Sequence, residues 1–131
     1  MNDASISTFK TKYTYTLIRP ISYIQNVFKD AGWNSVIPTP PHPEYSAAHA
    51  VISAASAAVL EKIFGTNYAF SDNTYASSYG IRNYASFDAY AKEAGHSRLM
   101  GGLHYGPSVD TGLIQGRKIG KLVNELSAKL N

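Results

Sequence analysis

The sequence contains no cysteine and no long hydrophobic run, and both absences exclude classes of protein. Without cysteine the chain can form neither a disulfide framework nor a thiolate nucleophile or metal ligand. No apolar stretch approaches the roughly 20 residues that a membrane-spanning helix needs. A glycine-rich phosphate-binding loop, a Gly-x-Ser-x-Gly elbow and a His-Glu-x-x-His metal motif are also missing. The first seven residues lack the basic and apolar segments of a secretory signal peptide.

Charge is scarce as well. Only 16% of the 131 residues are charged, the formal net charge is +3, and no run of Lys and Arg exceeds two residues. This pattern gives no basic patch for nucleic acid, so we expect no nucleic-acid partner. A hydrophobic content of 44% at this length fits one soluble domain over residues 1–131, either complete or part of a longer chain.

Apolar spacing and capping residues predict an all-α fold. The predicted helices cover Ser5–Ile18, Pro20–Lys29, Ser46–Phe64 and the segment from a Ser86 cap to about Gly101, and a last helix follows Gly106-Pro107. The helix that begins with Ser46 as N-cap and ends at Gly65 is rich in alanine and serine, so neighbouring helices can approach it closely. We interpret it as the buried central helix.

Two loops and the last helix complete the predicted fold. Asp30–Tyr45 holds four prolines, which forbid a regular element. Thr66–Ala85 is an aromatic loop with a short hairpin around Asp72-Asn73 or Gly80. Ser108 or Asp110 is the predicted cap of the last helix. Its predicted core residues are Leu113, Ile114, Ile119, Leu122, Val123, Leu126 and Leu130.

Lys12 and Arg19 are the first candidate functional residues. On a continuous helix they lie two turns apart on one face. Two such cations are commonly a solvated face. The alternative is an anion clamp, in which the guanidinium acts as a planar fork and the ammonium as a point charge.

His49 stands at the start of the alanine-rich helix, directly after the proline-rich loop. The first amides of a helix are unpaired and its N-terminal dipole end favours anions. Ala47 and Ala48 therefore offer backbone N–H groups, and His49 offers a general acid and base. The alternative is a histidine that packs in a buried helix with one partner.

Arg98 and His104 flank the glycine pair Gly101-Gly102, which lets the backbone bend between them. A histidine beside an arginine can attack phosphorus or ligate vanadium through one ring nitrogen. The alternative is a surface arginine and a loop histidine, and we treat His42 and His96 as background. Taken with Lys12, Arg19 and His49, the pair predicts one pocket for a tetrahedral oxyanion, phosphate or vanadate.

These stretches resemble the three-part signature of the vanadium haloperoxidase and type 2 phosphatidic acid phosphatase superfamily. The signature is Lys, six residues, Arg-Pro; then Pro-Ser-Gly-His; then Ser-Arg, five residues, His. Lys12 with Arg19-Pro20 matches the first part, and Ser97-Arg98 with His104 matches the third. The segment Pro43–His49 resembles the middle part, and residues 87–95 look more like the bacterial haloperoxidase branch than the membrane lipid phosphatases.

The resemblance implies a helical bundle, here in a shortened form, with the anion between helix ends. It implies that Lys12, Arg19 and Arg98 bind the anion's oxygens and that His49 is the acid–base residue. His104 is then the phosphatase nucleophile or the vanadate ligand of a haloperoxidase. Vanadate is the implied cofactor of a haloperoxidase, and a phosphatase needs none.

The sequence departs from the family pattern at two places. Ala47 and Ala48 replace the serine and glycine before the middle histidine, which removes a hydroxyl donor. The acidic residue that orients the nucleophilic histidine usually lies four positions after it, where this chain has Ser108, with Asp110 two positions further. The resemblance also implies helices before the lysine motif that residues 1–131 do not include, and we expect that a second copy of the chain could complete the pocket.

Three functions follow as hypotheses. The first is an enzyme that holds vanadate on His104 and uses peroxide to oxidise halide, acting with a small-molecule substrate. The second is a phosphomonoesterase that forms a phosphohistidine at His104. The third, from a different class, is a non-catalytic helical domain that keeps a relic anion pocket. We expect an enzyme.

Overall fold

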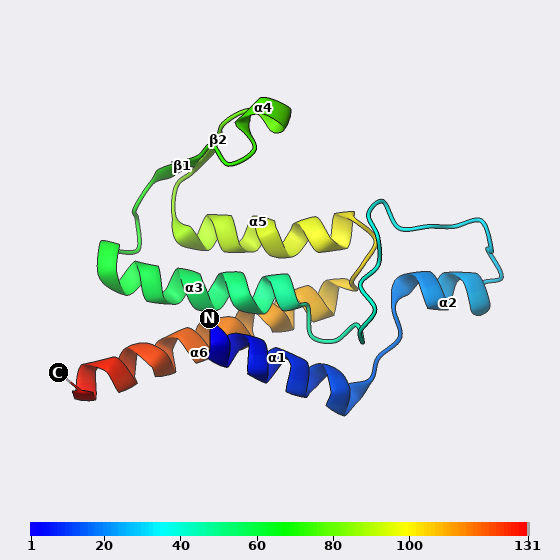
Figure 1. Cartoon of the computed structure of the whole chain (residues 1–131), viewed down its shortest axis with the longest axis horizontal. Coiled ribbons are helices and arrows are strands. Elements are labelled where there is room, and N and C mark those ends of the chain that lie inside the picture. The colour runs from blue at the N-terminus through cyan, green and yellow to red at the C-terminus, as the bar shows by residue number, and fades with distance from the viewer. Residues whose placement is uncertain (131) are drawn as a thin grey trace.

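Helix α3 (Ala48–Phe64) lies at the centre of the fold in the computed structural model, which describes residues 1–130. Helices α1 (Asn2–Tyr15), α5 (Phe87–Met100) and α6 (Gly106–Leu130) pack around it (Figure 1). The buried residues of α3 are mostly small: Ala50, Val51, Ala54, Ala55, Ala57 and Ala58. Because these side chains add little bulk, three helices can approach α3 closely. The predicted all-α class and the buried central helix are confirmed.

The remaining elements are short and lie outside the bundle. Helix α2 (Pro20–Asn26) stands beyond one end of the four long helices, and a hairpin stands off on the side of α5 (Figure 1). The hairpin joins β1 (Phe70–Asp72) to β2 (Arg82–Tyr84) in antiparallel register, with α4 (Ala76–Tyr79) between the strands. The hairpin predicted within the aromatic loop is therefore confirmed.

Helix ends were predicted well where the capping residue acts locally. The Ser86 hydroxyl accepts a hydrogen bond from the Ala89 amide at 3.1 Å at the start of α5, and Gly65 follows the last residue of α3. Helix α1, however, ends at Tyr15 because Thr16 adopts a left-handed conformation with φ 47°. The predicted continuation to Ile18 is wrong, so one helix face does not bring Lys12 and Arg19 together.

The start of α3 also differs from the prediction. Ala47, not Ser46, is the N-cap residue, and no side chain caps the helix. The Ser46 hydroxyl donates instead to Gln115 Oε1 at 2.7 Å. The Ala47 amide donates to the Ser108 carbonyl at 3.2 Å, which ties the start of α3 to the start of α6.

Helix α6 begins at Gly106. The prediction that Ser108 or Asp110 caps this helix is therefore wrong. Its contact face with α3 is a stripe of glycines at every fourth position: Gly112, Gly116 and Gly120. A Cβ at Gly120 would lie 2.6 Å from the Ala55 carbonyl oxygen, and one at Gly116 would overlap the backbone of α3. The absence of side chains on this stripe lets the two backbones touch.

This stripe changes which residues of α6 are buried. Leu113 and Ile119 pack against the core, and Val123 is partly buried. Three other predicted core residues are mostly exposed: Ile114, Leu122 and Leu126. The prediction for them is wrong because the face of α6 that meets α3 carries glycine rather than large apolar residues. The prediction for Leu130 lies outside the described side chains.

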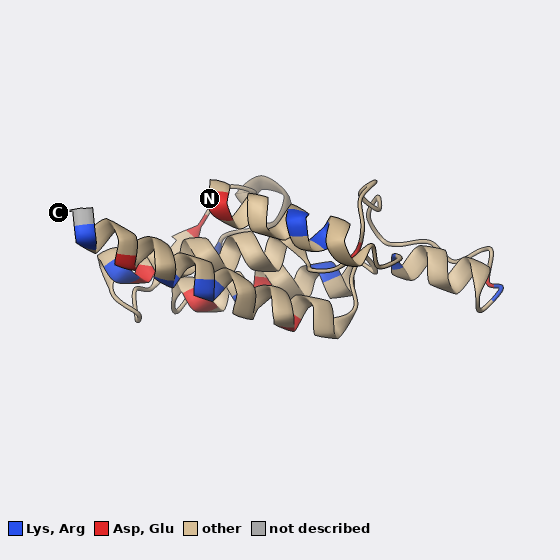
Figure 2. Ribbon diagram, turned by 90° about the horizontal axis from the view of Figure 1, so that it is seen from below, with Lys and Arg blue, Asp and Glu red and all other residues tan. Residues whose placement is uncertain are grey.

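Charged residues recur along the ribbon of α6, whereas the ribbon of α2 carries none (Figure 2). None of the helices in residues 1–130 combines the length and the hydropathy that a membrane crossing requires.

Candidate functional site

Glu44, in the loop before α3, is the centre of a buried hydrogen-bond network. Its carboxylate accepts from His104 Nδ1 and from the Ser108 hydroxyl, each at 2.7 Å, and from the Tyr105 amide at 3.1 Å. Its own amide donates to the Leu17 carbonyl at 2.8 Å. The Glu44 side chain is fully buried. One carboxylate therefore fixes the α5–α6 turn and the first turn of α6 against the proline-rich loop.

This network keeps Glu44 ionised. Burial by itself raises the pKa of the carboxyl group. The hydrogen bonds from His104, Ser108 and the Tyr105 amide favour the charged form and outweigh burial, so the net pKa lies below the usual value. Glu44 was not among the predicted site residues.

The partners of His104 define its tautomer. Because the Glu44 carboxylate can only accept, Nδ1 carries the proton that it donates. The other ring nitrogen, Nε2, lies 3.0 Å from Arg19 NH1, and a guanidinium can only donate. Nε2 therefore holds a lone pair. Burial, together with the positive charge of Arg19, lowers the pKa of His104 and favours this neutral form.

Arg19 is the residue just before α2, and its side chain extends into the site. Its NH1 donates to the Leu103 carbonyl at 2.9 Å, and its Nε donates to the His42 carbonyl at 3.1 Å. Its NH2 lies 3.0 Å from His42 Nδ1. Burial lowers the pKa of the guanidinium, and the charge of Glu44 opposes that change. His42, which had been set aside as background, is in direct contact with the site.

Lys12 reaches the same loop from α1. Its ammonium donates to the carbonyls of Pro43 at 2.7 Å and Glu44 at 2.8 Å, and the residue has no exposed surface. Burial and the nearby charge of Arg19 lower its pKa to about 8. Lys12 and Arg19 therefore both donate hydrogen bonds to carbonyls of the proline-rich loop, although they do not share a helix.

Arg98 and His49 face the same region from α5 and α3. Among the side chains that the structure describes, Arg98 Nε is the one buried polar atom without a hydrogen-bond partner. Desolvation and then the charge of Arg98 lower the pKa of His49, and His104, His42 and Lys12 add to this effect. The His49 side chain is itself exposed. Its imidazole is thus neutral at pH 7 and accessible from solvent.

Two predicted roles need correction. The Ala47 amide donates to the Ser108 carbonyl, so it is not free to bind an anion. Ala48 opens α3, and its amide has no acceptor within the helix, so it stays a candidate donor. Asp110 is exposed and its side chain makes no hydrogen bond with the described residues, so it does not orient His104. Ser108 contacts the Glu44 carboxylate and thus acts on His104 only indirectly.

The charges of the site do not balance. The site holds three cations, Lys12, Arg19 and Arg98, and one carboxylate, Glu44, while the lowered pKa values of its histidines (His42, His49 and His104) favour their neutral forms. Like charges at close range cost several kcal/mol unless a counter-charge is bound (about 4 kcal/mol per pair at 4 Å and an effective dielectric constant of 20). The unpartnered Arg98 Nε–H could donate to an oxygen of a tetrahedral oxyanion, and the lone pair on His104 Nε2, which here accepts from Arg19 NH1, could bind its central atom. The residues present therefore fit such an anion.

The described residues contain no cluster of three or more His, Cys, Asp or Glu side chains that could hold a metal cation.

The sequence matches the family model of the VCPO second helical-bundle domain over residues 1–131. The chain belongs to this family. No curated protein matches the sequence. The vanadium haloperoxidase-like assignment predicted from the three motifs is confirmed, together with the helical-bundle fold.

The chain is similar to parts of larger proteins of known structure. A bacterial vanadium-dependent iodoperoxidase matches at 42% identity and a TM-score of 0.87, over 94% of this chain and 30% of its own. The holo and apo forms of a bacterial vanadium-dependent chloroperoxidase match at 17% identity and a TM-score of 0.81, over 97% of this chain. They share the fold, and the chain covers 33% and 34% of their lengths. The chain thus spans about a third of the proteins that it matches.

Proposed function

We propose that this domain is the oxyanion-binding part of a vanadium-dependent haloperoxidase, with vanadate as cofactor and a halide as substrate. The observation that carries the proposal is the buried Glu44–His104–Arg19 chain, which leaves a lone pair on His104 Nε2 beside a guanidinium. Identity of 42% to a bacterial vanadium-dependent iodoperoxidase supports it and makes iodide the first halide to test.

Each side chain has a distinct task in this proposal. His104 Nε2 would hold the metal centre, while Lys12, Arg19 and Arg98 would bind and neutralise the oxygens. The unpaired amide of Ala48 would add a donor at the start of α3. Vanadate, when bound, supplies a Lewis-acid centre that activates hydrogen peroxide toward halide.

Proton transfer is assigned to His49. Its lowered pKa keeps the imidazole neutral at pH 7, so it can accept a proton from a peroxide or water molecule at the site. Glu44 keeps the Nδ1 proton on His104 and thereby keeps the lone pair on the other nitrogen. The same lone pair would serve a phosphomonoesterase, in which His104 attacks phosphorus and His49 protonates the leaving group.

Anion binding is tested first, without turnover. Vanadate or phosphate at about 100 times its Kd should stabilise the chain by about 2.7 kcal/mol, which corresponds to a Tm increase of roughly 10 °C. Sodium chloride at equal ionic strength is the control. Equal shifts in both salts would refute the oxyanion site.

Turnover is tested next by iodide oxidation with vanadate and hydrogen peroxide, and by p-nitrophenyl phosphate hydrolysis. His104→Ala should abolish either activity. His96→Ala is the matched control, because His96 is exposed and its Nδ1 contacts only the Lys92 carbonyl. Specific anion stabilisation without turnover in this chain would instead support the relic pocket.

A further inference from the structure

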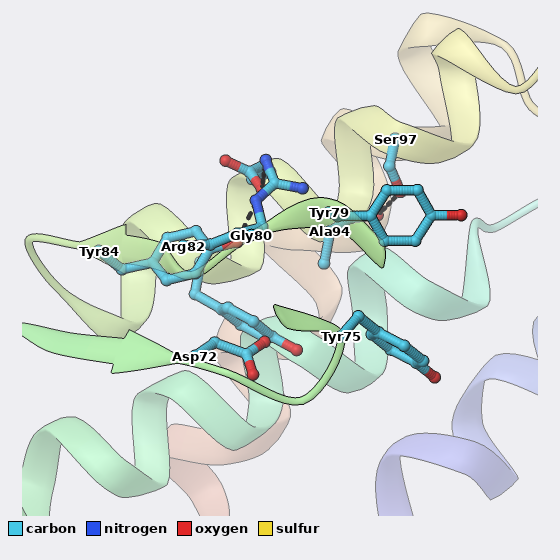
Figure 3. A pocket seen from close by; sticks show the side chains of 10 residues that line it. Asp72, Tyr75, Tyr79, Gly80, Arg82, Tyr84, Ala94 and Ser97 are labelled. Carbon is cyan, nitrogen blue, oxygen red and sulfur yellow. Dashed lines mark hydrogen bonds and ion pairs between the residues drawn. The ribbon is translucent and has the colours of Figure 1, made fainter. Parts of the chain in front are cut away.

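A cavity of about 290 Å³ lies between the hairpin and the outer face of α5, apart from the oxyanion site. Tyrosines form much of its wall: Tyr75, Tyr79, Tyr84 and Tyr90. Figure 3 shows Tyr84 on one side of the space, Tyr75 and Tyr79 on the other, and Asp72 between them. None of the residues assigned to the oxyanion site lines this cavity.

The ring arrangement leaves aromatic surface open to the cavity. Tyr84 and Tyr90 meet edge to face, with ring centroids 5.0 Å apart and planes at 80°. Tyr75 and Tyr79 are also nearly perpendicular, with centroids 6.4 Å apart. Both of these rings are mostly exposed. In an edge-to-face pair one ring keeps both of its faces clear of its partner, and a ring face carries negative quadrupole charge.

The charged side chains of the cavity leave one carboxylate without an ionic partner. Glu93 Oε1 accepts from Arg82 NH2 at 2.6 Å and from the Tyr84 hydroxyl at 2.8 Å, so Arg82 and Glu93 neutralise each other. Asp72 accepts from the Thr74 amide through one oxygen at 2.9 Å. The Thr74 side chain also hydrogen-bonds to this carboxylate, and no ion pair to Asp72 forms within the part of the chain that the structure describes. The hydrogen bonds from Thr74, followed by the charge of Arg82, lower the pKa of Asp72 and keep it ionised.

We propose that this cavity binds a small organic cation, an alkylammonium or quaternary ammonium group, between the tyrosine rings and the Asp72 carboxylate. Tyrosine faces attract such cations, and the attraction is stronger where water is excluded. The three charged residues of the lining carry a net charge of −1, which disfavours anions. This binding needs neither vanadate nor peroxide, so it stands or falls separately from the proposed function.

The test is titration calorimetry of the whole chain with choline and with 3,3-dimethylbutan-1-ol, a neutral molecule of the same shape. Choline should bind at least ten-fold more tightly than the neutral molecule. Phenol and benzoate complete the set as an uncharged and an anionic aromatic ligand, and both should bind more weakly than choline. Equal affinity for the neutral molecule, tighter binding of phenol or benzoate, or no binding of choline would overturn the proposal.

Amino-acid substitutions test whether choline binds in this cavity. Asp72→Asn keeps an oxygen that can accept from Thr74 but removes the charge, and it should weaken choline binding about ten-fold. Tyr79→Leu should weaken it several-fold through the loss of one ring face. Tyr13→Leu removes an exposed tyrosine on α1, outside the cavity, and should leave the affinity unchanged. Circular dichroism checks that each variant is folded, and unchanged affinity in both cavity variants would contradict the assigned site.

Discussion

Replacing Glu44 with glutamine tests the network on which the site depends. The substitution preserves the shape of the side chain and one acceptor oxygen but removes the charge. The three hydrogen bonds now made to the carboxylate involve His104, Ser108 and the Tyr105 amide. With glutamine, one oxygen becomes an NH₂ donor, so at least one of these donors loses its acceptor. The buried charges of Lys12 and Arg19 also lose their nearby counter-charge.

The expected magnitude follows from burial. Removing one partner of a fully buried charged network costs about 3–5 kcal/mol, because the remaining charges stay out of water. For a chain of this length, the corresponding decrease in Tm is roughly 10–20 °C. Urea denaturation and thermal melts at pH 7, without phosphate in the buffer, measure both quantities.

Glu93→Gln is the matched control. Glu93 is an ion-pair partner whose side chain is 45% exposed, so its loss should cost less than about 1 kcal/mol. The pH dependence adds a second check. The folded-state pKa of Glu44 is lowered, so its contribution is fully present above its ordinary value of 4.5 and is lost as pH falls through the folded-state pKa. The difference between wild type and Glu44→Gln should therefore shrink only below pH 4.5. A Glu44→Gln variant as stable as Glu93→Gln at pH 7 would refute this account of the site.

Two further predictions concern Lys12 and the glycine stripe. Because the pKa of Lys12 falls from 10.5 to about 8 on folding, the unfolded chain binds more protons between these values. The contribution of Lys12 to the free energy of unfolding should therefore rise by about 3 kcal/mol between pH 8 and pH 10.5. Thermal melts of the Lys12→Met variant should lack this rise. Parallel pH profiles of wild type and variant would contradict the prediction. Gly116→Ala should cost about 1–3 kcal/mol in urea denaturation because its Cβ would overlap the backbone of α3, whereas Gly106→Ala, with nothing within 4 Å, should change stability by less than about 0.5 kcal/mol. Equal effects of the two substitutions would contradict the close packing of α3 on α6.

Local signals predicted the helices well, and close packing explains most of the errors. The Ser86 cap and Gly65 mark helix ends through contacts within a few residues, so they are legible in the sequence. The buried face of α6 cannot be identified in this way, because an analysis of hydrophobic periodicity detects large apolar side chains and not glycines. The contact with α3 depends instead on Gly112, Gly116 and Gly120. A glycine at every fourth position was the available signal for this face.

The candidate site shows the same division between local and distant information. The spacing of Lys12, Arg19, Arg98 and His104 is a sequence pattern, and it predicted the cations and the imidazole together. Glu44 lies 60 residues from His104, and no local pattern links the two. The available signal was the acidic residue near the end of the proline-rich loop, five residues before His49. Tertiary structure alone shows that this loop packs against the α5–α6 turn.

Glu44 also explains why Ser108 is compatible with an oriented His104. The family pattern implies an acidic residue four positions after the histidine, and this chain has a serine there. In the structure the Ser108 hydroxyl donates to one oxygen of Glu44 at 2.7 Å while His104 Nδ1 donates to the other at the same distance. Ser108, four positions after the histidine, therefore still contributes to the orientation of His104. The negative charge, however, comes from Glu44 in the proline-rich loop. A carboxylate at Ser108 in addition to Glu44 would place two buried negative charges in contact, and one of them would have to take up a proton. The pairing of a serine at this position with a glutamate in the loop keeps a single charge beside His104, and that single charge is what holds the lone pair toward Arg19.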